Sequence, residues 1–497
     1  MNMESEASRR DRIAAVLPRR RQLFYDGSWH ESVSGRRFEV RNPANGDSLG
    51  EVSEAGPEDA DEAVRAAYRA FALWRRVPPL ERAAKLRETA RRLRANVAEL
   101  ALLDAADCGN PVRAMAGDVN VAATFLDYYA GLVTEVKGET VPMDPGVVNY
   151  TVREPLGVVV RIVPFNHPLM FAAMKIAAPL ATGNAVILKP PEQAPLSALR
   201  LAELVEDLYP PGVVNVLNGG KTLGAALSAH PLVRKVAVIG SVPTGRAVMR
   251  SGADTVKQLT LELGGKNALI AYPDADPVKV AAGAVFGMNL SWTAGQSCGA
   301  TSRVFLHSRI YDETLRRIVD AVSRIHPSIP TDDDCEMGCL VSREQYEKVV
   351  DYIRSGTEEG AHLMCGGGEP ADPRLKRGTF IEPAVIADVR QSMRVAREES
   401  FGPVMCVLRW DDEDEMFAAV NSVEQGLTAS IWTRDLAAAH RAAARVEAGY
   451  VWVNASSSHF LGVPFGGYKQ SGFGREECFE ELLSYTQVKN VHVKLEP

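Results

Sequence analysis

Short apolar segments alternate with helical segments in the region that follows Tyr150. The apolar runs read GVVVRIVPF, NAVILKP, VVNVLN and VRKVAVIG, and Ala- and Leu-rich stretches such as residues 196–209 separate them. Strands that alternate with helices at this spacing predict a parallel sheet with helices on both faces. Such a sheet binds ligands at the carboxyl ends of its strands, where the strand order reverses.

Patterns on either side of this region predict further units. Apolar residues at helical spacing predict two amphipathic helices, at residues 57–77 and 81–107. A second α/β unit is expected to begin around residue 259, with the segment LTLELGGKNALIAY. The alternating residues 485–495 predict a half-exposed strand that pairs with residues 147–155 in a small projecting sheet. Because an exposed sheet edge must be paired or covered, a subunit contact is a natural use for it.

Composition limits the class of protein. The 497 residues are 46% hydrophobic and 24% charged, which predicts a globular chain of several domains. The net charge of −7 offers no basic field for a polyanion, so nucleic-acid binding is not expected. The basic segment 9–21 lacks the apolar core of a secretory signal. We interpret residues 1–22 as a basic tail leading to the first strand, and the alternative is a leader for import or partner binding.

The cysteines indicate the redox compartment of the protein, and hydropathy indicates whether the chain crosses a membrane. The seven cysteines are odd in number and scattered, which is not a disulfide framework, so a reducing cytoplasm is expected. Cys335 and Cys339 have no second Cys or His pair at zinc-finger spacing, so no metal site is predicted. The uncharged residues 280–302 could span a bilayer, but they contain Asn289, Gln296 and several Gly. We interpret them as buried interior and expect no membrane partner.

The glycine-containing turns do not match known phosphate loops. NGGKTLG, which begins two residues before Gly220, has Asn215 where a P-loop needs its first glycine, and GSVPTGRA has Arg246 in place of the required Lys. No G-x-G-x-x-G follows the first strand. A glycine turn with Ser241 near a helix start can still place a phosphate against free backbone N–H groups. The alternative is an ordinary tight turn.

A cation and a carboxylate follow the strand in ILKPPE. Lys189 and Glu192 are expected where a parallel sheet offers its binding edge, and together they can hold a ribose diol from two sides. The carboxylate would repel a 2′-phosphate, which favours NAD over NADP. A solvated Lys and Glu after a strand is the alternative interpretation.

The segment GQSCGATSR places a thiol in a loop of small residues. A free cysteine is usually an inert core residue, but the Gly and Ser around Cys298 leave room for a reacting atom. In LELGG, Glu262 ends an apolar strand, where a buried carboxyl would have a raised pKa suited to a general base. In PFNHP, the Asn166 amide can donate to a developing oxyanion.

Seven segments together resemble the NAD(P)-dependent aldehyde dehydrogenase superfamily, in its hydrolytic, non-acylating branch. In order, they are PFNHP, ILKPPE, IGSVPTG, LELGGK, GQSC, EESFGPV and PFGGYKQSGFGRE. The resemblance runs from about Asp26 to Leu495. It implies an α/β fold with a Rossmann-like cofactor domain, an α/β catalytic domain and a small β oligomerisation flap. The implied boundaries are 23–133 with 153–261 for the cofactor domain, 262–470 for the catalytic domain, and 134–152 with 480–497 for the flap.

The resemblance implies a role for each matching residue. Cys298, as thiolate, attacks the aldehyde carbon, and the Asn166 amide and the Cys298 backbone N–H hold the oxyanion. After hydride transfer to NAD, Glu262 activates the water that releases the acid. Lys175 and Glu476 match a proton-relay pair. The implied cofactor-binding residues are Val163, Pro164, Phe165, Lys189, Glu192, Gly220, Gly224, Ser241, Leu263, Glu399 and Phe401. The implied substrate-binding residues are His167, Met170, Met174, Trp292, His459 and Phe460.

Departures from the family pattern concern the substrate. Phe165 replaces a commoner Trp, His167 follows Asn166, and Asn218 stands where a glycine is often found. His167 is either a base or a pocket-lining residue, and we favour the second because the mechanism already has Glu262. Soft and aromatic side chains in the implied tunnel, without an obvious Arg or Lys, indicate an apolar or aromatic aldehyde.

Two other functions stay open at this stage. A coenzyme-A-acylating enzyme passes the acyl group to CoA and needs no general base at position 262. A structural or binding homologue would keep the fold without activity. Whichever of the three functions holds, a homodimer or homotetramer is expected.

Overall fold

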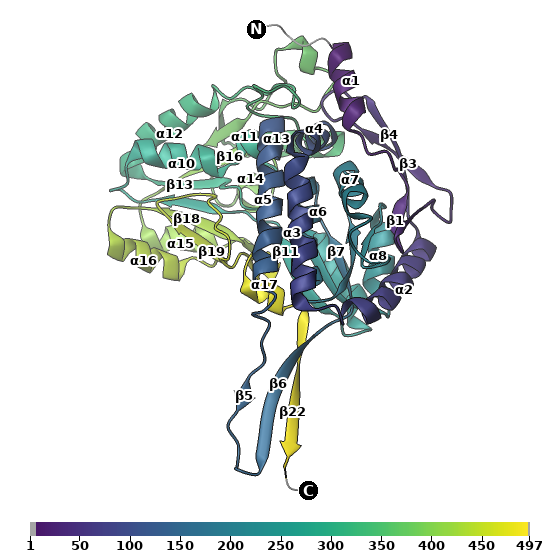
Figure 1. Cartoon of the computed structure of the whole chain (residues 1–497). Helices are drawn as coiled ribbons and strands as arrows, with labels where there is room; N and C mark the ends of the chain where they lie inside the picture. The colour runs from purple at the N-terminus through teal and green to yellow at the C-terminus, as the bar shows by residue number, and fades with distance from the viewer. Residues whose placement is uncertain (1–5, 496–497) are drawn as a thin grey trace.

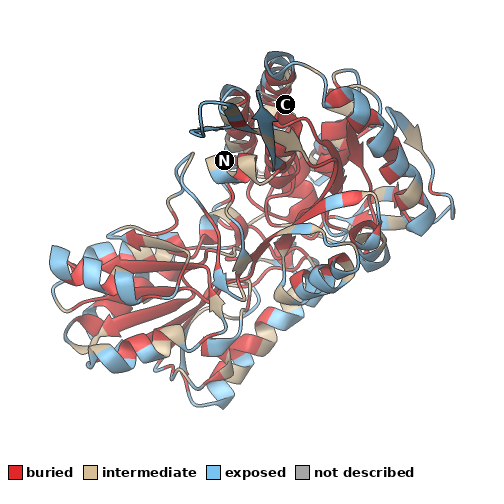
Figure 2. Cartoon of the chain, turned by 90° about the horizontal axis from the view of Figure 1, so that it is seen from below, coloured by how far each residue is buried: buried red, intermediate tan, exposed pale blue. Residues whose placement is uncertain are grey.

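The computed structural model describes residues 6–495 and contains two α/β units and a three-stranded sheet. The small sheet extends away from the body of the molecule (Figure 1). Buried residues gather in two lobes, each around one large sheet (Figure 2). Residues 1–5 of the predicted tail and residues 496–497 of the predicted flap lie outside the described residues.

The first sheet has eight strands in the order β2-β1-β9-β8-β7-β10-β11-β21. Their bounds are β1 (Leu23–Tyr25), β2 (Ser28–His30), β7 (Val158–Ile162), β8 (Ala185–Lys189), β9 (Val214–Val216), β10 (Val233–Gly240), β11 (Gln258–Leu263) and β21 (Gly472–Phe473). Strands β9, β8, β7 and β10 are parallel, as predicted, and β11 joins them in parallel. The strand order reverses between β7 and β10, which is where such sheets bind ligands.

Alternate side chains of β7 enter two different cores, as the two-residue period of a strand requires. Val159 belongs to one buried cluster, and Val158 and Val160 belong to the other. The helices of the first cluster are α3 (Pro79–Ala95), α4 (Val97–Cys108), α5 (Val112–Gly131), α6 (Pro168–Ala181) and α7 (Leu196–Val205). Those of the second are α2 (Pro57–Trp74), α8 (Lys221–Ala229) and α9 (Val242–Ala253). Both faces of the sheet are therefore covered by helices, as predicted.

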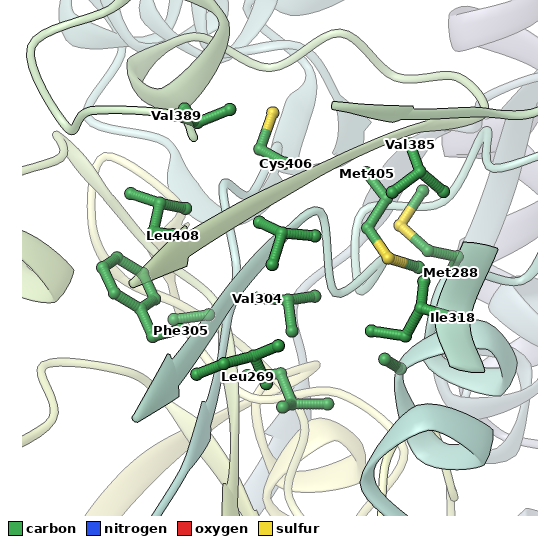
Figure 3. Packing of buried hydrophobic residues seen from close by; sticks show 14 of the residues in the cluster. Leu269, Met288, Val304, Phe305, Ile318, Val385, Val389, Met405, Cys406 and Leu408 are labelled. Atoms are coloured by element: carbon green, nitrogen blue, oxygen red, sulfur yellow. The ribbon is translucent and has the colours of Figure 1, made fainter. Parts of the chain in front are cut away.

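The second sheet has seven strands in the order β14-β15-β16-β13-β12-β18-β19. Their bounds are β12 (Ala268–Ala271), β13 (Arg303–His307), β14 (His362–Cys365), β15 (Ala384–Ala387), β16 (Val404–Trp410), β18 (Thr428–Trp432) and β19 (Tyr450–Val453). Its helices are α10 (Pro277–Gly287), α12 (Ser308–Val322), α13 (Arg343–Glu358), α15 (Glu413–Asn421) and α16 (Leu436–Arg445). Leu269, Val304 and Met405 lie in the apolar core around this sheet (Figure 3).

The small sheet joins two segments far apart in the sequence. Strands β6 (Val147–Pro155) and β22 (Thr486–Lys494) pair antiparallel, with Tyr150 opposite Val491. The pairing expected for these alternating segments is confirmed. The other short elements are α1 (Glu6–Val16), β3 (Arg37–Arg41), β4 (Ser48–Ser53), β5 (Thr140–Val141), α11 (Leu290–Thr293), η1 (Pro373–Leu375), α14 (Arg394–Arg397), β17 (Gln425–Gly426), β20 (Tyr468–Lys469) and α17 (Phe479–Leu483).

Three expectations about elements and boundaries need correction. The helix predicted over 81–107 is two helices, because Asn96 leaves the helical conformation (φ −122°, ψ 23°) between α3 and α4. The second unit does not begin at 259, because β11 pairs in parallel with β10, so the change of sheet falls between Leu263 and Ala268. The basic segment includes α1, which is held to the body by an ion pair of 2.8 Å between Arg9 and Asp332.

Most of the uncharged segment 280–302 is buried in α10, α11 and the loop that follows. Across residues 6–495, no helix has both the length and the apolar character needed to cross a membrane.

Two buried carboxyls of α4 hold the starts of neighbouring helices. Asp104 Oδ2 accepts from the backbone N–H of Leu169 at 3.1 Å, and Asp107 Oδ2 accepts from that of Leu196 at 2.8 Å. The first N–H groups of a helix have no partner within it, so these side chains satisfy α6 and α7 from outside. Burial raises the pKa of Asp104 to about 7, and among residues 6–495 its Oδ1 has no hydrogen-bond partner.

We expect Asp104→Ala to lower the free energy of unfolding by about 1–3 kcal/mol, because it leaves the Leu169 N–H buried and unpaired. Asp104→Asn keeps an acceptor and is the matched control. Since the folded pKa is raised, the folded state holds a proton that the unfolded state releases, and wild-type stability falls as the pH rises toward 7. The thermal midpoint of Asp104→Asn relative to wild type should therefore rise from pH 5 to pH 7 and then level off. A constant difference over this range would contradict the prediction.

Candidate active site

All the predicted catalytic and substrate-binding residues line one cavity of about 660 Å³. The walls come from α5, α6, the ends of β10 and β11, the loop between α11 and β13, and the loop after β19. The cavity therefore lies at the carboxyl edge of the first sheet, facing loops of the second unit. Helix α6 begins just after Asn166 and His167, so the segment between β7 and α6 contributes two of these residues.

One side-chain amide binds two backbone carbonyls of the loop that contains Cys298. Asn267 Nδ2 donates to the Cys298 carbonyl at 2.7 Å and to the Ala300 carbonyl at 2.9 Å. Gly265 packs against the same loop so closely that a Cβ there would lie 2.5 Å from the Cys298 carbonyl oxygen. Sequence reasoning missed Asn267, although its place directly after LELGGK was a signal.

Glu262 lies next to Cys298 at the end of β11. Its side chain is buried, and Oε1 has no hydrogen-bond partner among residues 6–495. Burial raises the pKa of Glu262 well above its usual value, and nearby Glu476 adds to the shift. Burial also raises the pKa of the Cys298 thiol, and the Glu262 carboxylate raises it further. Both shifts favour the neutral forms, so the thiol can give its proton to Glu262 only in molecules in which Glu262 is ionised.

Asn166 is held by its backbone while its side chain faces the cavity. Asn110 Nδ2 donates to the Asn166 carbonyl at 2.8 Å. The Asn166 side chain is 3% exposed and lines the cavity together with Cys298. An amide in this place can donate to an oxygen of a molecule bound at the thiol. Asn110 was not predicted, because it lies 56 residues away in the sequence.

Lys175 and Glu476 form part of a buried ion cluster. Glu476 accepts from Lys175 Nζ at 2.8 Å and from Arg161 Nη2 at 3.0 Å. Burial alone would raise the pKa of Glu476, but Lys175 and Arg161 lower it to about 2. A carboxylate held this way is a fixed anion and a poor proton acceptor near neutral pH. The relay role stays a prediction, and this geometry does not favour it.

Lys189 and Glu192 lie at the carboxyl edge of the first sheet, as predicted. Lys189 ends β8, and burial lowers its pKa to about 8 against the opposing effect of Glu192. Glu192 is exposed and lies over Gly220, where a Cβ would come within 2.5 Å of Oε1. Gly224 lies beside the Lys189 stem, with its Cβ position 3.8 Å from Cε. Gly220 therefore allows the close approach of the Glu192 carboxylate, whereas a Cβ at Gly224 would make only an ordinary van der Waals contact with Lys189.

Ser241 begins α9, which starts at the end of β10. Its Oγ accepts from the Thr244 N–H at 3.4 Å. Gly245, one turn into the helix, packs on Leu263 at the end of β11. Val163 and Pro164 follow β7 at the same edge. A helix N-terminus and small residues at the reversal of strand order suit a dinucleotide pyrophosphate.

Glu399 connects this edge to the thiol loop. Its Oε1 accepts from the Gly265 N–H at 2.9 Å, and a Cβ on Gly264 would lie 2.1 Å from Oε2. Phe401 meets Phe165 edge to face at 5.7 Å. Two of the predicted cofactor residues, Glu399 and Phe401, thus contact the segments that follow β11 and β7, and Glu399 lies close enough to raise the pKa of Cys298.

The substrate side of the cavity is mostly apolar and aromatic. Met170, Met174 and Trp292 lie deep in it, whereas Phe460, 64% exposed, lies at its mouth. The structure adds Phe125, Phe171, Phe465, Glu477 and Asn289 to the predicted lining. Among residues 6–495, no group of three or more His, Cys, Asp or Glu is placed to hold a metal ion.

Fold and site together define a two-sheet α/β protein in which a thiol and a carboxyl share a cavity beside a dinucleotide-type sheet edge. The model of the "Aldehyde dehydrogenase family" matches residues 29–491. Aldehyde dehydrogenase tropH of Talaromyces stipitatus is 50% identical over 490 residues, covering 97% of this chain and 95% of that protein. Retinaldehyde dehydrogenase 3 of Mus musculus is 41% identical over 485 residues, covering 96% and 93%.

A solved structure also shows the similarity to aldehyde dehydrogenases. The NAD+ complex of aldehyde dehydrogenase from Bacillus cereus has a TM-score of 0.94 at 38% identity, with 100% of both chains covered. The chain belongs to the aldehyde dehydrogenase family and is an oxidoreductase of that family, whose general reaction is the oxidation of aldehydes to acids.

The contact between the Cys298 thiol and the Glu262 carboxyl leads to a prediction about the rate at which Cys298 is alkylated. Because the Cys298 pKa is raised, the rate of its reaction with iodoacetamide should increase with pH through the alkaline range. Glu262→Gln removes the charge that raises the thiol pKa, so alkylation at pH 8 should become several-fold faster. Peptide mass spectrometry separates Cys298 from the partly buried Cys365, which serves as the internal control. Equal Cys298 rates in both proteins would show that the carboxyl does not act on the thiol.

Proposed function

We propose that the protein is an NAD-dependent aldehyde dehydrogenase that oxidises an apolar or aromatic aldehyde to the carboxylic acid through a thioester on Cys298. The observation that carries the proposal is the contact between Cys298 and Glu262 on a cavity that Asn166 also lines. A nucleophile, a base and an oxyanion donor are the three groups that this chemistry needs.

In the first half of the reaction, the Cys298 Sγ forms a bond to the aldehyde carbon. The thiol proton passes to Glu262, whose raised pKa makes it a competent acceptor. The carbonyl oxygen becomes an oxyanion, which accepts hydrogen bonds from the Asn166 amide and the Cys298 backbone N–H. NAD held at the sheet edge would supply the two-electron oxidant that accepts a hydride from the same carbon. Cys298 is then acylated as a thioester.

In the second half, Glu262 takes a proton from a water molecule that attacks the thioester carbon. The C–S bond breaks, the thiol of Cys298 is restored and the carboxylic acid leaves. Glu262 must be unprotonated for this step, so its proton has to leave through the cavity between the two halves. The buried ion cluster holds Lys175 and Glu476 in the cavity wall, where Glu476 raises the pKa of the base and Lys175 opposes that shift.

The residues at the sheet edge fit NAD. Lys189 and Glu192 would hold the adenosine ribose, with the exposed Glu192 carboxylate opposing a 2′-phosphate. The α9 N-terminus at Ser241 would hold the pyrophosphate. Glu399, which the Gly265 N–H already orients, would hold the nicotinamide ribose with Phe401. Structures of relatives such as the Bacillus cereus enzyme contain NAD+, which supports this assignment.

The proposed domains follow the two large sheets. The first sheet and its helices form the cofactor domain, the second forms the catalytic domain, and the sheet of β5, β6 and β22 is the oligomerisation flap. The flap strands carry exposed apolar side chains, including Val148, Tyr150 and Val488. Such a surface supports a homodimer or homotetramer in which this sheet is a subunit contact.

The proposed reaction is tested by mixing enzyme, benzaldehyde and NAD without CoA. We expect continued NADH formation in wild type and none in Cys298→Ala, which should still bind NAD by calorimetry. Glu262→Gln should lose at least about 100-fold in steady-state rate, because the general base is removed. Release of only one NADH per wild-type site without CoA would instead support the acylating alternative. Unchanged turnover in Cys298→Ala would remove the thiol from the mechanism.

Cofactor preference is tested at Glu192. The ratio of kcat/KM for NAD to that for NADP should exceed one in wild type and fall about tenfold or more in Glu192→Ser, because the carboxylate no longer repels the 2′-phosphate. Gln193→Ser, at the adjacent exposed position, is the control and should keep the wild-type ratio. A wild-type preference for NADP would contradict the role given to Glu192.

A further inference from the structure

A buried carboxylate of α5 holds two aromatic rings of the cavity wall. Asp118 is completely buried. Its Oδ1 accepts from Trp292 Nε1 at 2.8 Å, and its Oδ2 contacts His167 Nδ1 at 2.7 Å. Trp292 and His167 both line the cavity that contains Cys298. None of the proposed catalytic steps uses Asp118, so this carboxylate needs another explanation.

The His167 ring is fixed in orientation by its neighbours. It meets Trp292 edge to face at 5.2 Å and Phe171 edge to face at 5.5 Å. Its side chain is about 10% exposed, and Nε2 makes no hydrogen bond within residues 6–495. A polar nitrogen is thus held in an otherwise aromatic part of the wall, where a bound substrate can reach it.

The hydrogen bonds of Asp118 decide which nitrogen of His167 carries the proton. An indole N–H can only donate, and an ionised carboxylate can only accept. Asp118 therefore accepts from both rings, and the proton of a neutral imidazole lies on Nδ1. The Nε2 atom then presents a lone pair to the cavity. A lone pair pairs with a hydroxyl donor and does not pair with an ether oxygen of similar size.

We infer that His167 is a specificity residue that accepts a hydrogen bond from a hydroxyl group of the aldehyde, and that Asp118 positions it. The substrate class is then a hydroxylated aromatic aldehyde, because the ring would pack among Met170, Phe171 and Trp292 while its hydroxyl meets Nε2. This inference rests on the proposed function.

The second histidine of the cavity is a weaker candidate for this role. His459 contacts Glu477 at 3.2 Å and packs on Phe465, but its side chain is 38% exposed at the mouth of the cavity. Within residues 6–495, no second side chain donates to Glu477, whereas Trp292 donates to Asp118. Water can compete for His459, whereas His167 lies in a site from which an aromatic substrate excludes water.

The experiment compares kcat/KM for benzaldehyde, the 3- and 4-hydroxybenzaldehydes and the matching methoxybenzaldehydes, with NADH formation as the readout. We expect wild type to favour at least one hydroxy compound over its methoxy partner by about tenfold, the effect of one buried hydrogen bond. In His167→Phe this ratio should fall to about one, because the acceptor that distinguishes a hydroxyl from a methoxy group is removed. His167→Gln, which offers an acceptor oxygen, should restore part of the ratio.

Asp118→Asn tests the positioning role through the tautomer. The Asn amide can still accept from Trp292 through its oxygen, but its NH₂ donates to His167 Nδ1 and moves the ring proton to Nε2. A donor at Nε2 binds hydroxyl and methoxy oxygens alike, so the ratio should fall toward one through a gain for the methoxy compound. Asp127→Asn, on the same helix but at the surface, should keep the wild-type ratio.

The outcomes separate the two proposals. No NADH from any aldehyde, aliphatic compounds included, means that the proposed function has failed. Activity on aldehydes without a hydroxyl preference, or with a preference that survives in His167→Phe, overturns the inference and leaves the proposed function standing. An equal loss of kcat/KM for every substrate in His167→Phe also overturns it, because His167 would then act in the chemistry.

Discussion

The site depends on a buried ion cluster that connects three parts of the chain. Arg161 lies on β7, Lys175 on α6, and Glu476 in the segment that leads to β22, and all three are at most 2% exposed. Charges this deeply buried are tolerated only when they are paired and hydrogen-bonded. The cluster therefore fixes the sheet, the helix that follows Asn166 and the C-terminal segment relative to one another. The charge of Glu476 in this cluster also raises the pKa of nearby Glu262.

The neighbouring buried carboxyls of Glu476 and Glu262 have pKa values that are shifted in opposite directions. Glu476, between two cations, has its pKa lowered to about 2 and stays charged. Glu262 has no such partner, and burial with the charge of Glu476 raises its pKa. Surroundings that push the pKa values of two carboxyls apart support the proposed roles, Glu476 as a fixed charge and Glu262 as a base. Asp118 adds a third case, in which a buried carboxylate orients a ring instead of moving a proton.

Elements with a clear period were predicted well, and contacts between distant segments were not. The parallel strands from 158 to 240 and the pairing of β6 with β22 follow from local alternation of apolar residues. The break at Asn96 was missed because the apolar period continues across it. The placement of β11 in the first sheet was missed because pairing with β10 or with β12 leaves the same local pattern. Asn110, Asp118 and Asn267 were missed as site residues because their partners lie far along the chain.

The sequence by itself determined the α/β class, the residues capable of this chemistry and the family they resemble, because residue type, period and motif order are local properties. Only the tertiary structure decided that these side chains share one cavity, that Glu476 is charged while Glu262 favours its neutral form, and that His167 shares Asp118 with Trp292. Proton affinity and ring orientation depend on burial and on neighbours brought together by folding, and these are absent from any single segment of the chain.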